Sequence, residues 1–359
     1  MAVNPGFWKG RRVFLTGHTG FKGAWLALWL QKVGAGVTAF SLDPPTMPNL
    51  FEAAQVARGI TSIRGDIRDY DALAAALSDS GASVVFHLAA QATVADGYRF
   101  ARDTFATNVT GTVNLLDAIR DCPPVTAAII VTSDKCYVPS PAGKPLREDD
   151  PLGGKDPYSA SKSCAEIAAA SWRESFFGTD ATPRIATARA GNVIGGGDWG
   201  AHRLLPDIVR AFHAEEPLSL RMPDAIRPWQ HVLEALSGYL LLAEHLCGKE
   251  GSRYARAWNF GPAEADHLTV GEIAERCANL WGGNARVEIA KTNFQKETET
   301  LRLDATHARA TLGWNPRWKA DQALRHTLDW YRAWYANPSD SAHIRALTLA
   351  QIGEYTTTQ

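Results

Sequence analysis

The stretch TSDKCY, residues 132–137, places an acid beside a base. It closes the apolar run AAIIVTSDKCY and sets Asp134 next to Lys135, directly after Ser133. A buried strand that ends in this way is either a surface turn with an exposed ion pair or one half of an active site. A carboxyl group can protonate a leaving hydroxyl, and a lysine that is desolvated beside other cations can act as a base. The residues of this stretch alone leave both interpretations open.

The stretch YSASK, residues 158–162, offers a second pair of groups. Tyr158 and Lys162 stand four residues apart, so on a helix the ammonium would lie near the phenol. A phenol with an ordinary pKa of about 10 is a poor base at neutral pH, but a lysine cation and an oxidised nicotinamide both favour the phenolate. The same spacing is common on solvated helix faces. A catalytic role therefore depends on a cofactor site elsewhere in the chain.

A glycine-rich turn is the sequence signal for that cofactor. In TGHTGFKG, three glycines (Gly17, Gly20 and Gly23) follow a strand pattern and open a helical one, so backbone amides could approach a pyrophosphate. Tight strand-to-helix turns also use glycine for steric reasons alone, and the strand–turn–helix context favours a dinucleotide. Asp43, twenty residues past Gly23, could bind a ribose 2′-hydroxyl and repel a 2′-phosphate, which favours NAD over NADP. It could instead be a helix-capping or turn residue.

The elements that must position these groups alternate along the first 190 residues. Strands are predicted at 11–17, 36–42, 83–90 and 126–133, and helices at 21–34, 69–81, 104–122 and 158–176. The strand runs are apolar on both faces, as a parallel sheet that is covered on each side requires. The fold class predicted is α/β, built from successive βαβ units around a parallel sheet.

The second half of the chain has a different pattern. Beyond GGGDW we expect Pro-rich loops and only scattered short elements, apart from a helix in YLLLAEHL and one more sheet strand in WNFGP. The sequence therefore predicts a smaller, looser lobe over residues 191–345, interleaved with returns to the first domain at about 228–262.

Composition narrows the classes of partner. The 359 residues are 45% hydrophobic and carry a net charge of -1, with no basic block that would follow a nucleic acid backbone. The longest early apolar run, AWLALWL, is too short to span a bilayer, and the amino terminus lacks a signal-peptide pattern. Five widely spaced cysteines without a CxxC pair argue against a disulfide framework and a zinc site. We expect a cytoplasmic protein with no membrane or nucleic acid partner.

Several longer strings carry a resemblance. TGHTGFKG, HLAAQ, TNVTGT, TSDKCY, YSASK and RAGNVIGGGDW together resemble the extended short-chain dehydrogenase/reductase family, in particular its nucleotide-sugar branch. TSDKCY, LGGKDPYSASK, ARAGNVIGGGDW and RPWQHVLE are more specific and resemble the CDP-D-glucose 4,6-dehydratases, whose role is in deoxysugar and lipopolysaccharide O-antigen synthesis. The match implies a Rossmann-type doubly wound sheet over residues 1–190, with a smaller, mixed α/β C-terminal lobe and the sugar site between them.

The resemblance also implies roles for the two pairs of groups. Ser133 would hydrogen-bond the C4 oxygen, Tyr158 would remove its proton, and the C4 hydride would pass to NAD+. The C4 ketone then makes the C5 proton acidic. Asp134 would protonate the departing C6 hydroxyl and Lys135 would be the C5 base or enolate stabiliser, before the hydride returns to C6. Dehydratases that act on dTDP-glucose carry Asp-Glu at these two positions, so Lys135 departs from them.

Binding residues follow from the same resemblance. Those expected around NAD are Gly17, Thr19, Gly20, Phe21, Lys22, Gly23, Asp43, Asp66, Ile67, Leu88, Ala89, Ala90, Gln91, Asn108, Tyr158 and Lys162. Those expected around the nucleotide sugar are Asn192, Arg203, Leu204, Arg227 and Asn259. Arg227 is the best candidate for the diphosphate, because a guanidinium can grip that anion through two parallel hydrogen bonds. Asp66 could equally cap the helix that follows it.

Three segments depart from the dehydratase pattern. After HLAAQ, Ala95 stands in place of an arginine and Gly97 in place of a serine. Beyond TSDKCY the chain reads VPSPAGKPLRE instead of an Asn and a WGYRE stretch, and Glu299 and Thr300 replace a His-Tyr pair. These segments are expected near the sugar or the base, so the hexose or the nucleotide could differ.

Other function classes stay open. A nucleotide-sugar 4-epimerase or 4-reductase would use only Tyr158 and Lys162, and a catalytically silent NAD-binding protein would use neither pair. The retained Asp134–Lys135 pair favours the dehydratase, because epimerisation needs no acid for a C6 leaving group. The helices that contain TNVTGTVNLLDAIR and YSASKSCAEIAAASWRESF resemble those of a four-helix dimer interface in this family, so we expect a homodimer or a higher homo-oligomer.

Overall fold

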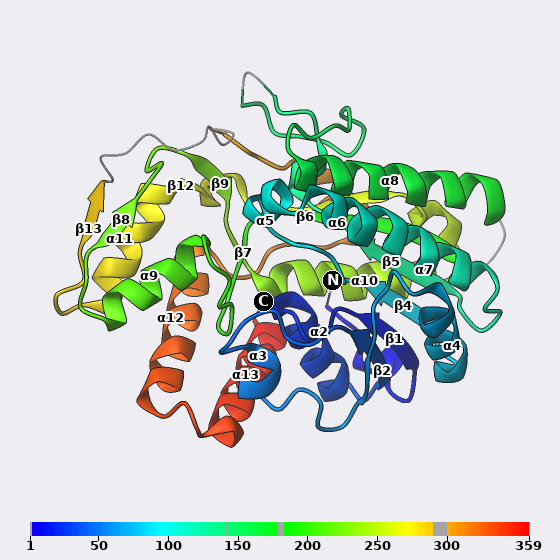
Figure 1. The fold of residues 1–359 in the computed structure, drawn as a ribbon, viewed down its shortest axis with the longest axis horizontal. Coiled ribbons are helices and arrows are strands. Elements are labelled where there is room, and N and C mark those ends of the chain that lie inside the picture. The colour runs from blue at the N-terminus through cyan, green and yellow to red at the C-terminus, as the bar shows by residue number, and fades with distance from the viewer. Residues whose placement is uncertain (1, 141–142, 179–182, 290–299, 359) are drawn as a thin grey trace.

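A seven-stranded sheet forms the centre of the structure (Figure 1). This computed structural model describes residues 2–140, 143–178, 183–289 and 300–358. The strands follow the order β11-β6-β5-β4-β1-β2-β3, and each neighbouring pair is parallel. Their bounds are β1 (Arg12–Thr16), β2 (Gly36–Ser41), β3 (Thr61–Arg64), β4 (Val84–His87), β5 (Ala127–Val131), β6 (Arg184–Ala190) and β11 (Ala257–Phe260). The predicted α/β fold with a Rossmann-type parallel sheet is confirmed.

Helices cover both faces of this sheet, because its central strands are apolar on both sides. All residues of β4 and β5 are buried. One face packs against α4 (Tyr70–Ser80), α7 (Gly111–Arg120) and α8 (Pro157–Phe176). The other face packs against α2 (Phe21–Lys32) and α10 (Val232–Leu246). In the described part of the chain, no helix combines the length and apolar character needed to cross a membrane.

The second half of the chain is more regular than the sequence suggests. Besides α10, four helices lie beyond residue 200 in the described part of the chain: α9 (Leu204–His213), α11 (Val270–Trp281), α12 (Ala320–Ala336) and α13 (Ser341–Thr357). The expectation of scattered short elements was therefore wrong. The buried residues of these helices are apolar or uncharged, such as Leu324, Leu328 and Trp330 on α12, and charged residues stand between them in the sequence. Three short strand pairs complete this half: β7 (Val193–Ile194) with β10 (Gln230–His231), β8 (Leu218–Leu220) with β13 (Val287–Ile289), and β9 (Ile226–Pro228) with β12 (His267–Thr269).

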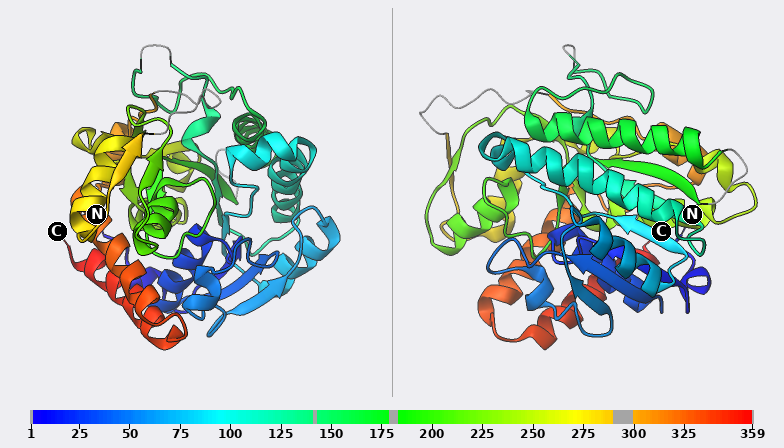
Figure 2. Two further views of the ribbon diagram at one scale, coloured as in Figure 1. Left: turned by 60° about the vertical axis from the view of Figure 1, so that its left-hand side comes forward. Right: turned by 45° about the vertical axis from the view of Figure 1, so that its right-hand side comes forward.

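Besides α10, the strand β11 and the helix α13 of the second half pack against elements of the first half. The strand predicted in WNFGP is β11, which pairs with β6 at the edge of the sheet. The last helix, α13, packs against α2 and α3 (Leu50–Ala53), and Figure 2 shows the C-terminal helices beside the first helices of the chain. Arg345 holds this contact by donating to the carbonyls of Ala54 and Gln55. The division of the chain into domains at residue 190 stays a prediction.

The structure differs from the predicted elements at two strands and one helix. The strands β3 and β6 were not predicted. The helix predicted over 104–122 contains a π-helical turn, Ala106–Thr110, between α6 (Ala101–Phe105) and α7. This turn carries Asn108, which is buried. The remaining short helices are α1 (Pro5–Trp8) and α5 (Val94–Arg99). The described residues also contain three 3-10 turns, Asp134–Cys136, Gly251–Tyr254 and Glu264–Asp266, and a second π-helical turn, Ala308–Leu312. All five cysteines are free thiols.

Candidate active site

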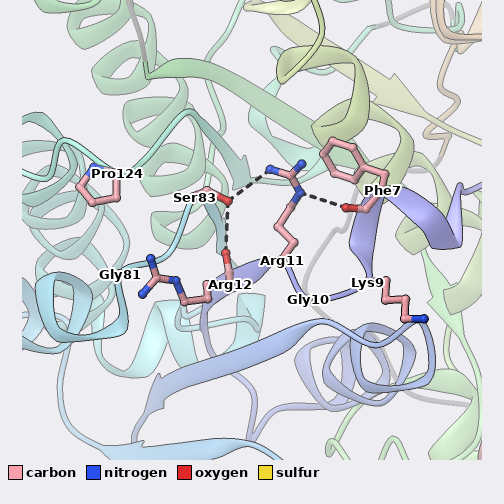
Figure 3. Close-up of a pocket in the computed structure, with 8 residues that line it drawn as sticks. All are labelled: Phe7, Lys9, Gly10, Arg11, Arg12, Gly81, Ser83 and Pro124. Carbon is pink, nitrogen blue, oxygen red and sulfur yellow. Dashed lines mark hydrogen bonds between the residues drawn. The ribbon is translucent and has the colours of Figure 1, made fainter.

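The predicted groups gather at one edge of the sheet. Gly17 follows β1, Leu88 follows β4 and Ser133 follows β5. The carboxyl ends of parallel strands share an edge, which is where ligands bind in open α/β sheets. The pocket in Figure 3 lies at the opposite edge, because its lining residues Arg12, Ser83 and Pro124 stand at or just before strand starts. None of the predicted site residues lines it.

The glycine-rich turn forms a close backbone cradle. Gly17 has a φ of +83°, and a Cβ there would lie 2.6 Å from the amide nitrogen of Ala89. A Cβ on Gly23 would lie 2.1 Å from the carbonyl oxygen of Gly17. Gly20 is the N-cap of α2, and no side chain of the described residues caps the first amides of this helix. The cradle fits a dinucleotide pyrophosphate, which needs glycines at these positions and uncommitted amides at a helix start.

Neighbouring side chains fix the cradle at the end of β2. The Thr19 hydroxyl lies 2.7 Å from Ser41 Oγ and donates to the carbonyl of Leu42. Asp43 lies just beyond, with its side chain 88% exposed and Arg64 Nε 2.8 Å from its carboxylate. The parallel pairing of β2 and β3 sets Ser41 beside Arg64, which explains this contact. The exposed carboxylate is free to face a ribose, while its partner Arg64 adds a cation beside it.

Asp66 and Ile67 follow β3 at the next strand end. The Asp66 carboxylate accepts hydrogen bonds from the backbone and the guanidinium of Arg68, which lower its pKa. The N-cap of α4 is Asp69, whose side chain accepts from the amide of Ala72. The alternative role of Asp66 as the cap of this helix was therefore wrong. Ile67 is buried against Gly111 of α7.

The segment after β4 is tied to the helix that carries the Tyr–Lys pair. Leu88 and Ala89 donate their amides to Thr16 at the end of β1, and Ala90 follows them. Asn108, in the π-helical turn, accepts from the amide of Gln91 at 2.8 Å and donates to its carbonyl at 3.0 Å. Its amide also donates to Ser161 Oγ, which in turn donates to the carbonyl of Tyr158. Asn108 therefore holds this segment in register with α8.

Tyr158 and Lys162 lie buried on the first turns of α8. Burial raises the pKa of Tyr158 to about 12, and a hydrogen bond with Ser133 and the charge of Arg203 oppose that rise. Burial also lowers the pKa of Lys162 to about 8, against the opposing charges of Glu166 and Cys136. The Lys162 ammonium donates to the carbonyl of Val131 at 3.3 Å. Without a bound cation nearby the phenol is protonated at neutral pH, so phenolate chemistry depends on further positive charge.

Asp134 and Lys135 form a 3-10 turn directly after Ser133, next to this phenol. Ser133 Oγ donates to Asp134 Oδ1 at 3.0 Å, and the Lys135 ammonium lies 3.5 Å from the same oxygen. Lys135 also reaches Asn192 Oδ1 at 3.5 Å, with its side chain 31% exposed. Asp134 is only 2% exposed, and its second oxygen Oδ2 is buried with no hydrogen-bond partner among the described residues. An acidic oxygen without a partner beside a phenol is suited to meet a hydroxyl of a ligand.

Lys22, in the glycine-rich turn, interacts electrostatically with both Asp134 and Lys135. Phe21 and Lys22 are the first two residues of α2, directly after Gly20 of the glycine-rich turn. The Lys22 ammonium lies 3.4 Å from the Tyr239 hydroxyl. Burial and the charges of Lys162, Arg203 and Lys135 lower the pKa of Lys22 to about 8, whereas the charge of Asp134 opposes this shift. Lys22 thus lies within electrostatic reach of three other basic side chains and of the Asp134 carboxylate.

The residues expected to bind the nucleotide sugar differ in burial and in the partners that their polar groups already have within the protein. Arg203, just before Leu204 at the start of α9, pairs with Asp198 at 2.9 Å, which raises the pKa of Arg203. Arg227 is buried in β9, and its guanidinium donates to the carbonyl of Ile226. Asn259 is fully buried, and its amide bonds Tyr137 and the carbonyls of Leu146 and Asp304. The substrate roles of these residues stay predictions.

The structure describes parts of all three segments that depart from the dehydratase pattern. Gly97 is buried on α5, where a Cβ would lie 3.0 Å from the amide nitrogen of Tyr158, and Ala95 is exposed on the same helix. Of the VPSPAGKPLRE stretch, residues 138–140 and 143–148 are described. Thr300 forms a bridge to Ile226, next to Arg227, whereas Glu299 lies outside the described residues.

Sequence reasoning missed two charged residues that lie behind the site. Glu166 on α8 and Arg189 on β6 form a buried ion pair at 2.8 Å. A signal for each was present: Glu166 follows Lys162 by four residues, and Arg189 interrupts the small apolar run RIATARA. Charged residues are almost never fully buried unless they are paired, so each of the two implies a buried partner, but the sequence does not show that they are each other's partner.

A glycine cradle and a buried Tyr–Lys pair at the same sheet edge define a Rossmann-type enzyme of the extended short-chain dehydrogenase/reductase class. The chain belongs to the NAD dependent epimerase/dehydratase family, whose model matches residues 13–259. It is 44% identical over 336 residues to a CDP-glucose 4,6-dehydratase of Salmonella typhimurium, with 92% of this chain and 93% of that protein covered. It is 28% identical to the low-salt glycan biosynthesis protein Agl12 of Haloferax volcanii, with 75% and 81% covered.

Solved structures share the fold. A dTDP-glucose 4,6-dehydratase of Streptomyces venezuelae, solved with NAD and TYD bound, has a TM-score of 0.76 at 23% identity and covers 91% of this chain and 99% of its own. A UDP-glucose-4-epimerase of Stenotrophomonas maltophila, solved with NAD and formylated UDP-arabinopyranose, has a TM-score of 0.78 at 21% identity with the same coverage. Dehydratases and epimerases thus share one backbone, and the side chains at the sheet edge must separate them.

Proposed function

We propose that this chain is an NAD-dependent nucleotide-sugar 4,6-dehydratase that converts CDP-D-glucose to CDP-4-dehydro-6-deoxy-D-glucose with loss of water. The observation that carries the proposal is the buried, unpartnered Oδ2 of Asp134 within the described residues, beside Ser133 and Lys135. A 4-epimerase or 4-reductase has no C6 leaving group to protonate. The relative in Salmonella typhimurium, named a CDP-glucose 4,6-dehydratase, supports the choice of reaction and nucleotide.

The residues that would hold NAD are those of the cradle and the strand ends. The amides at the start of α2 would meet the pyrophosphate, Asp43 the adenosine ribose, and Asp66 with Ile67 the adenine. NAD, when bound, accepts the hydride from C4 and later supplies it to C6. Its positive ring would also add the charge that the Tyr158 phenolate needs, because burial holds the pKa of Tyr158 at about 12.

The first half-reaction belongs to α8 and Ser133. Ser133 would hydrogen-bond the C4 hydroxyl, and the Tyr158 phenolate would take its proton as the C4 hydride leaves. The Lys162 cation would stabilise that phenolate. The product is the C4 ketone, which makes the C5 proton acidic.

The second half-reaction belongs to the turn after β5. Lys135 would take the C5 proton in its neutral form, and Asp134 in its acid form would protonate the C6 hydroxyl so that it leaves as water. The hydride returned to C6 and the proton returned to C5 complete the 4-keto-6-deoxy sugar. Over one turnover Tyr158 gains one proton and Asp134 loses one, so the number of protons on the site is unchanged. Ser133 hydrogen-bonds both groups and lies between them.

Substrate binding would use the second half of the chain. Arg227 and Asn192, which lies beside Lys135, would hold the anionic diphosphate, and Arg203 with Leu204 would line the nucleotide pocket. Asn259 is a further candidate for substrate binding. Gly97 and Thr300 leave smaller side chains near Tyr158 and β9 than the dehydratase pattern has. These departures make a different nucleotide-hexose the main alternative substrate for the same chemistry.

We also propose that the enzyme is a cytoplasmic homodimer, or a larger assembly built on that dimer, in deoxysugar synthesis for lipopolysaccharide O-antigen. Large apolar side chains are exposed on the outer surface formed by α6 and α8, which lie side by side in Figure 1: Phe100 just before α6, Phe105, Ile167 and Phe176. A second copy would cover them across a two-fold axis. Ile167→Glu should therefore favour monomers in light scattering, whereas Ile289→Glu on β13, also exposed, should not.

The direct test of the reaction is a panel of nucleotide-hexoses incubated with the enzyme and NAD. Mass spectrometry should detect a product lighter by one water from CDP-D-glucose. Inversion at C4 without water loss would instead establish an epimerase. Water loss from another nucleotide-hexose alone would keep the chemistry and correct the substrate.

A further inference from the structure

A buried carboxylate outside the residues assigned so far lies directly behind the Tyr–Lys pair. Glu166 follows Lys162 by one turn of α8 and is 3% exposed. Its two oxygens accept from the hydroxyl of Thr132, from the hydroxyl of Thr187 at 2.7 Å, and from Arg189 Nη2 at 2.8 Å. These donors come from the segment after β5 and from β6, so Glu166 joins the catalytic helix to two strands of the sheet.

Glu166 also acts on the charge of Lys162. The Lys162 side chain is buried, which lowers its pKa to about 8, and Glu166 is the largest influence that opposes this shift. Residues one turn apart on a helix face each other, so this carboxylate is placed to stabilise the ammonium. Removal of its charge would make the buried ammonium lose its proton at a lower pH.

The Glu166–Arg189 pair reaches both ends of the TSDKCY segment. Glu166 bonds Thr132, the first residue of that segment, and Arg189 Nη1 donates to the hydroxyl of Tyr137, the last residue, at 2.8 Å. Tyr137 in turn donates to Asn259 on β11 at 2.6 Å. Ser133, Asp134 and Lys135 lie between the two anchored ends. The same ion pair thus supports the segment of the acid and base as well as the helix of the phenol.

We propose that Glu166 is a positioning residue for both halves of the reaction: it keeps Lys162 charged, and it holds TSDKCY at one end directly, through Thr132, and at the other end through Arg189 and Tyr137. This inference rests on the proposed dehydratase function for its kinetic readout. It places the coupling between the hydride step and the elimination step in a side chain that touches neither the sugar nor the cofactor.

The test is Glu166→Gln, which keeps the shape and a hydrogen-bond acceptor but removes the charge. The alkaline limb of the kcat profile should move to lower pH by about one unit or more, because an opposite charge nearby shifts a pKa by that amount. KM should change little. Thr187→Val is the matched control, since it removes one hydrogen bond to the same carboxylate but keeps its charge, and its alkaline limb should stay in place.

A second variant guards against misfolding, because an unpaired Arg189 would be a buried charge. Glu166→Gln combined with Arg189→Met removes the pair together, and the same shift of the alkaline limb is expected. If both variants retain the parent limb and only unfold at lower temperature, the pair is purely structural and the proposal is wrong. Glu166→Asp, which restores the charge, should return the limb toward its parent position.

A readout without sugar separates this inference from the proposed function. Lys162 is expected at the cofactor, so the pH dependence of NAD+ affinity, measured by calorimetry, should shift in Glu166→Gln in the same direction. A shift in NAD+ binding without any sugar dehydration would support the role of Glu166 and reject the dehydratase. Unshifted NAD+ binding in an enzyme that does dehydrate CDP-D-glucose would overturn the inference and keep the function.

Discussion

The two halves of the candidate site are built in different ways. Tyr158 and Lys162 stand on one regular helix, are buried, and have their backbone held by Asn108 through Ser161. Asp134 and Lys135 stand on a three-residue turn, where one oxygen of Asp134 has no partner among the described residues and Lys135 is partly exposed. The pair on the helix is therefore held in place through the backbone of α8. The pair on the turn belongs to a short segment at a strand end and leaves one buried oxygen available for a ligand.

This contrast explains how one fold can serve several reactions. Hydride transfer at C4 needs only the helix pair and the cofactor cradle, which dehydratases and epimerases of similar backbone can share. Elimination needs an added acid and base at the sugar, and a strand-end turn can supply them without a change in the sheet. The substitutions below therefore separate the two halves of the site.

The largest effect is expected at the helix pair. Tyr158→Phe removes the group that takes the C4 proton, so every later step should fail, including transient NADH absorbance on addition of CDP-D-glucose. Tyr98→Phe is the matched control, because Tyr98 is exposed and has no assigned role. Formation of NADH at the parent rate in Tyr158→Phe would remove Tyr158 from the mechanism.

A smaller effect is expected for Lys135, the proposed general base on the turn after β5. Lys135→Met should slow elimination by about 100-fold, which is typical for loss of a general base, while C4 oxidation persists. Exchange of the C5 hydrogen with deuterated water should be suppressed in the same variant. Lys144→Met, at an exposed lysine, should behave like the parent. Normal C5 exchange in Lys135→Met would show that another group is the base.

The pH dependence should also separate the halves. Since the pKa of Lys162 lies at about 8, its cation is present below that pH and is lost as the pH rises through it. The rate of C4 oxidation in a single turnover should therefore fall by about fivefold over the first unit above that pKa, and by about tenfold for each further unit, in step with the lost cation. Stopped-flow NADH absorbance measures it. A rate that stays constant through the alkaline range would mean that the Lys162 charge does not assist the phenolate.

The smallest effect concerns the cofactor end. Asp43→Asn should reduce the preference for NAD over NADP by about tenfold, because repulsion of the 2′-phosphate is lost and Arg64 no longer has its carboxylate partner. Calorimetric titration with both cofactors measures the ratio. Asp329→Asn, which also removes one member of an exposed ion pair, is the control. An unchanged ratio would place Asp43 away from the ribose.

The parts of this structure that depend on local pattern could be predicted from the sequence. The glycine turn, the Tyr–Lys spacing and the buried strands are each contained in a short window, and they lie where they were expected. The helices α11 and α12 were missed although their buried residues recur at helical spacing among exposed charged residues, as Ile273 with Cys277 and Leu324 with Leu328 show. The cap of α4 was also misplaced, since Asp66 and Asp69 are equally plausible in sequence and only the backbone at the helix start distinguishes them.

The support behind the site could not be predicted for a different reason. The Glu166–Arg189 pair, and its link through Tyr137 to Asn259, depends on the neighbouring order of β5, β6 and β11 in the sheet. That order joins residues far apart in the chain, and no local spacing encodes it. The contact between Lys135 and Asn192 also joins residues far apart in the chain, so local spacing does not predict it either.

The central claim is that Asp134 is the acid for elimination and has no part in C4 oxidation. Rapid quench of Asp134→Asn with CDP-D-glucose and NAD measures both steps at once, by NADH absorbance and by the mass of the sugar. We predict that bound NADH and a 4-keto-hexose accumulate while water loss slows by about 100- to 10,000-fold. Water loss at the parent rate would contradict the account, make the Asp134–Lys135 pair a turn without a catalytic role, and favour a 4-epimerase or 4-reductase.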